Sequence, residues 1–154
     1  MTVVIRPATP LDASALADIY LASRKIFLPY APLAHTDAEV REWIANVLTP
    51  SGGVTVAIAL DKPIGMMARS HDGPLVWIDH LYLHPSVVGQ GLGSQLLERA
   101  KQESASLIRL YTFQANTAAR RFYERHGFRP IAFSDGAGNE ERCPDVLYEF
   151  NSHT

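Results

Sequence analysis

Three glycines at alternate positions are the residues of this sequence with the clearest chemical potential. Gly89, Gly91 and Gly93 lie between a predicted strand and a predicted helix. Glycine lets the backbone turn sharply and come close to a ligand, and the unpaired amides of a helix N-terminus favour a phosphate. The turn that could hold a phosphate comprises Gly89, Gln90, Gly91, Leu92, Gly93 and Ser94.

Other phosphate-binding motifs fit this turn less well. A P-loop ends in glycine, lysine and serine or threonine, and no lysine follows these glycines. A dinucleotide fingerprint counted from Gly89 needs its third glycine where this chain has Ser94. Glycines also form ordinary tight turns. The turn alone therefore leaves a coenzyme, a dinucleotide and no ligand as open alternatives.

Polar side chains at two further places could take part in chemistry. Asp79 is a carboxylate in a mostly apolar strand, which is unusual unless the group is paired or used. His80, beside it, titrates in a useful pH range. Strand alternation predicts that Asp79 shares a face with Leu81 and that His80 lies on the opposite face. Asn116 is the expected N-cap of a helix.

The elements that must position these residues follow from apolar periodicity and from turn residues. One helix begins at Thr9 and Pro10, and a second begins with the capping box that opens at Thr36. Further helices are expected from the glycine turn to about residue 103 and over residues 117–126. The expected strands cover residues 3–6, 54–60, 64–70, 75–83, 107–113, 129–133 and 146–150. We expect an exposed loop at 134–145.

Length and composition limit the possible classes of protein. The 154 residues suit one domain over 1–154, with 47% hydrophobic and 19% charged residues. No apolar run reaches the roughly 18 residues of a membrane span. The net charge of −2 and the lack of a basic block argue against a nucleic-acid partner. A single cysteine, Cys143, excludes an intrachain disulfide and is typical of the cytoplasm.

Two stretches together resemble the signatures of the GCN5-related N-acetyltransferase (GNAT) family. The first runs from Ile78 to Pro85 and continues with Gly89 to Gly93, and the second runs from Asn116 to Phe128. The resemblance covers essentially the whole chain. It implies an α/β (α+β) fold with a mixed, mostly antiparallel sheet of six to seven strands, a splayed parallel pair, and about four helices on both faces. Val88 departs from the family pattern, which usually has arginine or glutamine there.

The same resemblance implies acetyl-coenzyme A as cosubstrate, with no metal. The cosubstrate would lie between the strand that ends at Leu83 and the strand that ends near Phe113. The implied cofactor-binding residues are Leu81, Tyr82, Leu83, Gly89, Gln90, Gly91, Leu92, Gly93, Ser94, Asn116 and Tyr123. Tyr123 would also be the catalytic acid and Asp79 the base, with His80 or water as alternatives for the base.

On the acceptor side, Phe27, Tyr30 and His35 are predicted to form a substrate pocket together with Asp79, although ordinary packing explains the first three equally well. The acceptor would be a primary amine of a small molecule, an amino acid or a peptide, attacking directly in a ternary complex. Without an extended acidic run, no strongly cationic acceptor is indicated. The alternative is a non-catalytic module that binds or senses acyl-coenzyme A. A homodimer, common in the family, is possible.

Overall fold

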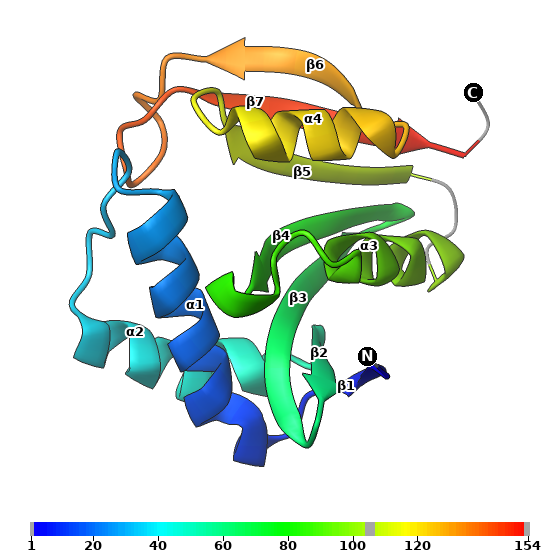
Figure 1. The fold of residues 1–154 in the computed structure, drawn as a ribbon. Helices are drawn as coiled ribbons and strands as arrows, with labels where there is room; N and C mark the ends of the chain where they lie inside the picture. The colour runs from blue at the N-terminus through cyan, green and yellow to red at the C-terminus, as the bar shows by residue number, and fades with distance from the viewer. Residues whose placement is uncertain (1, 104–106, 153–154) are drawn as a thin grey trace.

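A computed structural model describes residues 2–103 and 107–152 of the chain, and Figure 1 shows it as a ribbon. Its strands are β1 (Val4–Pro7), β2 (Val54–Ala59), β3 (Lys62–Asp72), β4 (Leu75–Leu83), β5 (Leu107–Phe113), β6 (Arg129–Ser134) and β7 (Asp145–Asn151). Its α-helices are α1 (Ala13–Phe27), α2 (Asp37–Trp43), α3 (Leu92–Glu103) and α4 (Thr117–Arg125). Every strand and helix expected from the sequence is present.

The strands form one seven-stranded sheet in the order β1-β2-β3-β4-β5-β7-β6. Every neighbouring pair is antiparallel except β4 and β5, which run parallel. The predicted fold class, a mixed and mostly antiparallel sheet with one parallel pair, is therefore confirmed.

The helices cover both faces of the sheet, as predicted. On one face, Leu16 and Ile19 of α1 and Val40 of α2 are buried in one cluster with Val56 and Met66 of the sheet. On the other face, a second cluster joins α3, α4 and strands β2 to β5 and β7; its fully buried members include Leu96, Leu97, Ile108, Leu110 and Tyr148. Burying one such side chain contributes about 1.5 to 3 kcal/mol to folding.

The start of α2 follows the capping-box prediction. The Thr36 hydroxyl accepts a hydrogen bond from the Glu39 amide at 3.1 Å, and the Glu39 carboxylate accepts one from the Thr36 amide at 2.9 Å. The expected single helix changes after Trp43 into a π-helical turn over Ile44–Leu48. It ends at Gly52, whose positive φ of 85° suits a residue without a side chain.

The start of α1 differs from the sequence-based expectation. Pro10–Asp12 form a 3-10 turn, and the α-helix begins only at Ala13. The reason is local: the Asp12 carboxylate accepts hydrogen bonds from the Thr9 amide at 2.7 Å and from Arg6 at 2.8 and 3.0 Å. These bonds hold the chain in the tighter turn.

Candidate active site

The parallel strands β4 and β5 separate soon after they meet. They pair only at Leu75–Leu107, Val76–Ile108 and Trp77–Arg109. In Figure 1 the two strands lie close at their N-terminal ends and far apart at their C-terminal ends. Beyond Trp77, the edge of β4 that faces β5 is free of ladder pairing with that strand, as the predicted splayed pair requires.

A β-bulge at Asp79 changes which side chains of β4 share a face. Ala68 of β3 pairs with His80 and Arg69 pairs with Ile78, so Asp79 is the extra residue. Ile78 consequently packs in the same core cluster as Leu81.

The predicted strict alternation along β4 was therefore wrong. His80 lies on the α1 side, 5.6 Å from the ring of Tyr20, yet it lines the same cavity as Asp79. A bulge depends on how the neighbouring strand pairs, so the sequence of β4 alone could not predict it.

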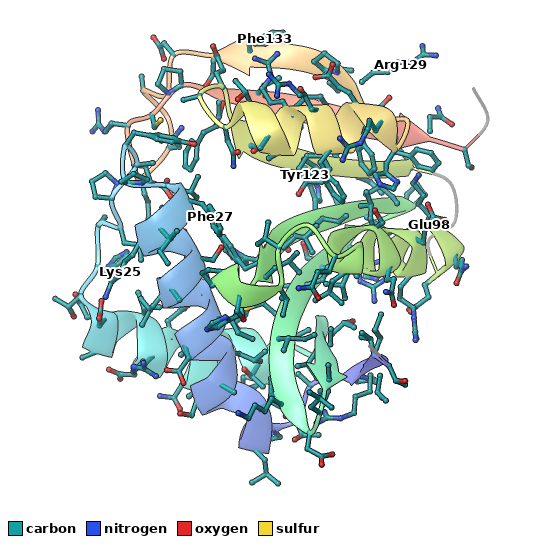
Figure 2. The ribbon with its side chains drawn as sticks, viewed as in Figure 1. Lys25, Phe27, Glu98, Tyr123, Arg129 and Phe133 are labelled. Atoms are coloured by element: carbon teal, nitrogen blue, oxygen red, sulfur yellow. The ribbon has the colours of Figure 1, made fainter. Side chains whose placement is uncertain are left out.

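A cavity of about 970 Å³ lies beside the separated strands. Of the predicted site residues, it is lined by Asp79, Leu81, Tyr82, Asn116, Tyr123 and His35. Leu83, the glycine turn, Phe27 and Tyr30 do not line it. Figure 2 shows Phe27 in the last turn of α1, and its side chain is 42% exposed. Tyr30 instead packs edge-on against Phe113, with ring centroids 6.3 Å apart.

Tyr123 is the buried phenol of this cavity. Its side chain projects from α4 toward the part of the molecule that holds α3 and β4 (Figure 2) and is only 8% exposed. Burial raises the pKa of Tyr123 well above that of a free phenol, so the hydroxyl keeps its proton at neutral pH. No hydrogen bond joins that hydroxyl to another described residue. The proton is therefore free to be donated to a molecule in the cavity.

Asn116 has one role that the structure shows. It is the N-cap of α4, and its side-chain oxygen accepts a hydrogen bond from the Ala119 amide at 3.2 Å. An asparagine side chain also carries two N–H donors. Asn116 also lines the cavity.

His80 lies in an aromatic cluster on the side of the cavity that α1 and α2 cover. Its ring is 5.4 Å from that of Trp43 and 6.0 Å from that of Tyr82. Burial lowers the pKa of His80 below its ordinary value, so the ring is neutral at neutral pH. Its Nδ1 is buried without a hydrogen-bond partner among the described residues. Asp79, by contrast, is exposed at the bulge.

Sequence reasoning missed Arg24, a lining residue that is 5% exposed. Its guanidinium donates to the Ala31 carbonyl and to the Glu141 carboxylate, both at 3.0 Å. The loop predicted to be exposed thus reaches back over the cavity, and Glu140 does the same toward His35 at 3.2 Å. A signal existed, because Arg24 lies one turn beyond Tyr20 on the apolar face of the predicted helix.

The glycine turn lies at the end of the short 3-10 turn Pro85–Val87 that follows β4. Gly89 and Gly91 have positive φ angles of 85° and 80°, and a Cβ added at either would meet no atom within 4 Å. The space in front of both residues is therefore open. No backbone hydrogen bond joins the amides of Gly89, Gln90 and Gly91 to a described residue.

These observations test whether a pyrophosphate fits the turn. Residues that take positive φ, face open space and present unpaired amides before α3 have the properties of a phosphate cradle. Gly93 is used differently: a Cβ there would lie 3.3 Å from the ring of Phe122, so the glycine lets α3 approach α4. The turn therefore fits an anionic ligand.

Two absences concern the described residues. Among them, no group of three or more His, Cys, Asp and Glu side chains is arranged to hold a metal ion. None of the helices over 2–103 and 107–152 has the length and apolarity needed to cross a membrane.

Comparisons with known proteins agree with this geometry. The sequence pattern of the acetyltransferase (GNAT) family matches residues 20–128. The peptidyl-lysine N-acetyltransferase YjaB of Salmonella typhimurium is 33% identical over 99 residues, which are 64% of this chain and 64% of that protein. The match thus spans less than two thirds of that relative. The spermine/spermidine N(1)-acetyltransferase of Bacillus subtilis is 24% identical over 135 residues, 84% of this chain and 89% of that protein.

Among solved structures, the PaiA N-acetyltransferase of Thermoplasma acidophilum in complex with coenzyme A has the same fold. Its TM-score with this chain is 0.75 at 22% identity, and the match covers 98% of this chain and 99% of that one.

Proposed function

Because the chain belongs to the acetyltransferase (GNAT) family, we propose that it transfers the acetyl group of acetyl-coenzyme A to a primary amine of a small molecule, an amino acid or a peptide. The observation that carries the proposal is the buried Tyr123 hydroxyl, which has a proton and no described partner, in the cavity beside the separated strands. A module that only binds coenzyme A would not need such a donor.

Acetyl-coenzyme A, when bound, supplies an acetyl group activated as a thioester. For its pyrophosphate we propose the amides of Gly89 to Ser94. For its pantetheine arm we propose the main chain of Leu81 to Leu83, at the edge that β5 leaves unpaired, and the Asn116 side chain. Val88 offers no charged side chain and is 49% exposed, so the backbone amides would account for most of the pyrophosphate binding.

The chemistry then requires a proton donor and a proton acceptor. We assign the donor to Tyr123, whose raised pKa means that it helps through a hydrogen bond to the departing sulfur and not as a strong acid. We assign the acceptor to Asp79, acting on the amine directly or through water. His80 is the second candidate, because it lines the same cavity and is neutral at neutral pH.

The charge of the cavity bears on the acceptor. Carboxylates from separate segments line it: Glu39, Asp79, Glu140, Glu141 and Asp145. Among the described residues that line the cavity, Arg24 is the one lysine or arginine. No acidic run exists in the sequence, but the fold gathers acidic side chains from separate segments. We therefore propose that amines with further positive charge, such as lysine side chains or polyamines, are accepted. Relatives named for peptidyl-lysine and spermine support this.

An amine panel tests the proposed function. Release of free thiol from acetyl-coenzyme A would be followed with polyamines, lysine peptides and neutral amino acids as acceptors. Turnover that is faster on the cationic amines would support both the activity and the acceptor class. Tight binding of acetyl-coenzyme A with no turnover on any amine would instead identify a binding module.

Substitution separates the two candidates for the base. Asp79→Asn and His80→Gln would be compared for kcat across pH 6 to 9, and the larger loss identifies the base. Two further predictions, a homodimer and a cytoplasmic location, would be checked by size-exclusion chromatography and by cell fractionation.

A further inference from the structure

One face of α3 contacts the C-terminal end of α4. Ser94, Glu98 and Lys101 share that face, since they are spaced i, i+4 and i+7; Figure 2 marks Glu98 on α3. All three reach His126. The Ser94 Oγ lies 3.0 Å from His126 Nε2, the Glu98 carboxylate lies 3.9 Å from His126 Nδ1, and the Lys101 ammonium donates to the His126 carbonyl at 2.6 Å.

Contacts with residues of α4 also hold His126 in place. His126 is the C-cap residue of α4, and its amide donates to the Tyr123 carbonyl at 3.1 Å. Its ring lies 4.8 Å from that of Phe122, and the side chain is 20% exposed. The contact between His126 and Ser94 is therefore part of the packing between two helices.

The contact matters because a serine hydroxyl has only one proton. The nearby Glu98 carboxylate favours a proton on His126 Nδ1, which leaves Nε2 to accept the Ser94 proton. When the ring is protonated, Nε2 donates to the Ser94 Oγ instead. The hydroxyl proton of Ser94 is then free for another acceptor. Ser94 is the third residue of α3, directly after the glycine turn.

We propose that His126 is a positioning residue for the pyrophosphate of the donor: its ring determines whether the Ser94 hydroxyl donates to imidazole or to the pyrophosphate. The inference rests on the proposed function, because that function places a pyrophosphate at the turn. The group bound there is a pyrophosphate or a phosphate diester. At low pH it gains the Ser94 hydroxyl as one more hydrogen-bond donor.

Linkage gives the direction of the pH dependence. A ligand that prefers the protonated ring binds more tightly as pH falls through the titration of His126. Burial lowers the pKa of His126 below its ordinary value, the charges of Lys101 and Arg125 lower it further, and Glu98 opposes them. The change in affinity therefore lies below about pH 6.5.

Calorimetric titration with dephospho-coenzyme A tests the inference. This probe has the pyrophosphate but lacks the phosphate monoester, whose own ionisation near pH 6 would confuse the result. We expect wild-type protein to bind it roughly tenfold more tightly at pH 5.5 than at pH 7.5, the ratio that one added charge-assisted hydrogen bond gives. His126→Gln and Ser94→Ala should each bring that ratio below about twofold.

His84→Gln is the matched control. His84 is a histidine near the same turn, but its Nδ1 bonds Ser86 at 2.7 Å, so this variant should keep the wild-type ratio. An unchanged ratio in His126→Gln would overturn the inference. If wild-type protein bound dephospho-coenzyme A at neither pH, the proposed function would fail first, and this inference with it.

A measurement on wild-type protein covers the case in which a variant does not fold. The imidazole resonances of His126 would be titrated by NMR with and without saturating dephospho-coenzyme A. Tenfold linkage corresponds to a pKa that rises by about 1 on binding. A pKa that stays the same or falls on binding would overturn the inference.

Discussion

Replacing Tyr123 with phenylalanine removes one hydroxyl group and little else. The aromatic contacts remain, because the ring itself packs 5.7 Å from Phe128 and 6.2 Å from Tyr148. The hydroxyl bonds no described residue, so its loss breaks no hydrogen bond within the described protein. We therefore expect the free energy of unfolding to change by less than about 0.5 kcal/mol.

The expected kinetic effect is much larger. General acid catalysis contributes about 10²- to 10⁴-fold. A thiol has a pKa of about 8.5 and a phenol about 10, and burial raises the pKa of Tyr123 still further. Full proton transfer to the sulfur is therefore uphill, which places the contribution at the low end. We expect kcat to fall about 100-fold, or about 2.7 kcal/mol in the barrier.

The assay is thiol release under saturating acetyl-coenzyme A and amine, and Tyr148→Phe is its matched control. The Tyr148 hydroxyl donates to Glu124 at 2.6 Å and accepts from Arg120 at 3.1 Å. That variant should therefore lose about 1 kcal/mol of stability and keep kcat within about twofold. The assignment of Tyr123 as the acid would be refuted if Tyr123→Phe kept its kcat, or if both variants lost it equally.

Three further predictions concern the turn, the buried ion pair and pH. Gly91→Glu should weaken coenzyme A binding at least about 100-fold in calorimetry, since it places a carboxylate in the phosphate cradle. Gly73→Glu is the control, because Gly73 also has a positive φ and open space in front of it, and this variant should not weaken binding. Arg24→Ala should lower the free energy of unfolding by about 2 to 3 kcal/mol in denaturant titrations, because it leaves the Glu141 carboxylate without its partner. Arg41→Ala, which removes an exposed ion pair, should change it by under about 1 kcal/mol. Equal losses in the two variants would contradict the burial argument. Stability should fall as pH drops below about 6.5, because the lowered pKa of His80 means that the unfolded chain binds more protons than the folded chain. Thermal melts of His80→Gln should show a shallower fall of stability with pH. An unchanged slope of stability against pH would refute this cause.

Much of the fold could be predicted from local sequence signals. The capping box at Thr36 and the N-cap at Asn116 both act as expected, because each depends on residues within one helical turn. The positions of the strands along the chain followed from their apolar patterns. The strict alternation along β4 failed, since the bulge at Asp79 arises from the register with β3.

The candidate site divides in the same way. The family resemblance implied Asn116 and Tyr123 as site residues, and both line the cavity. Arg24 and Glu141 are 117 residues apart in sequence, and only the folded chain brings them to 3.0 Å. Phe27 and Tyr30, predicted for the substrate pocket, do not line the cavity: Phe27 is exposed, and Tyr30 packs against Phe113. Long-range contacts decide such positions.

The three residue pairs between β4 and β5 also bear on how the native state opens. Strand pairing divides the sheet into two ladders, β1 to β4 and β5 to β7. The two ladders are joined by that short contact and by the core that α3 and α4 share. Contiguous sets of this kind are the units that unfold together in hydrogen exchange. Amides of the β5–β7 ladder should therefore exchange as a group of their own. A ligand that touches both ladders would slow exchange in each, so the two halves would gain cooperativity only when the opening between them is filled.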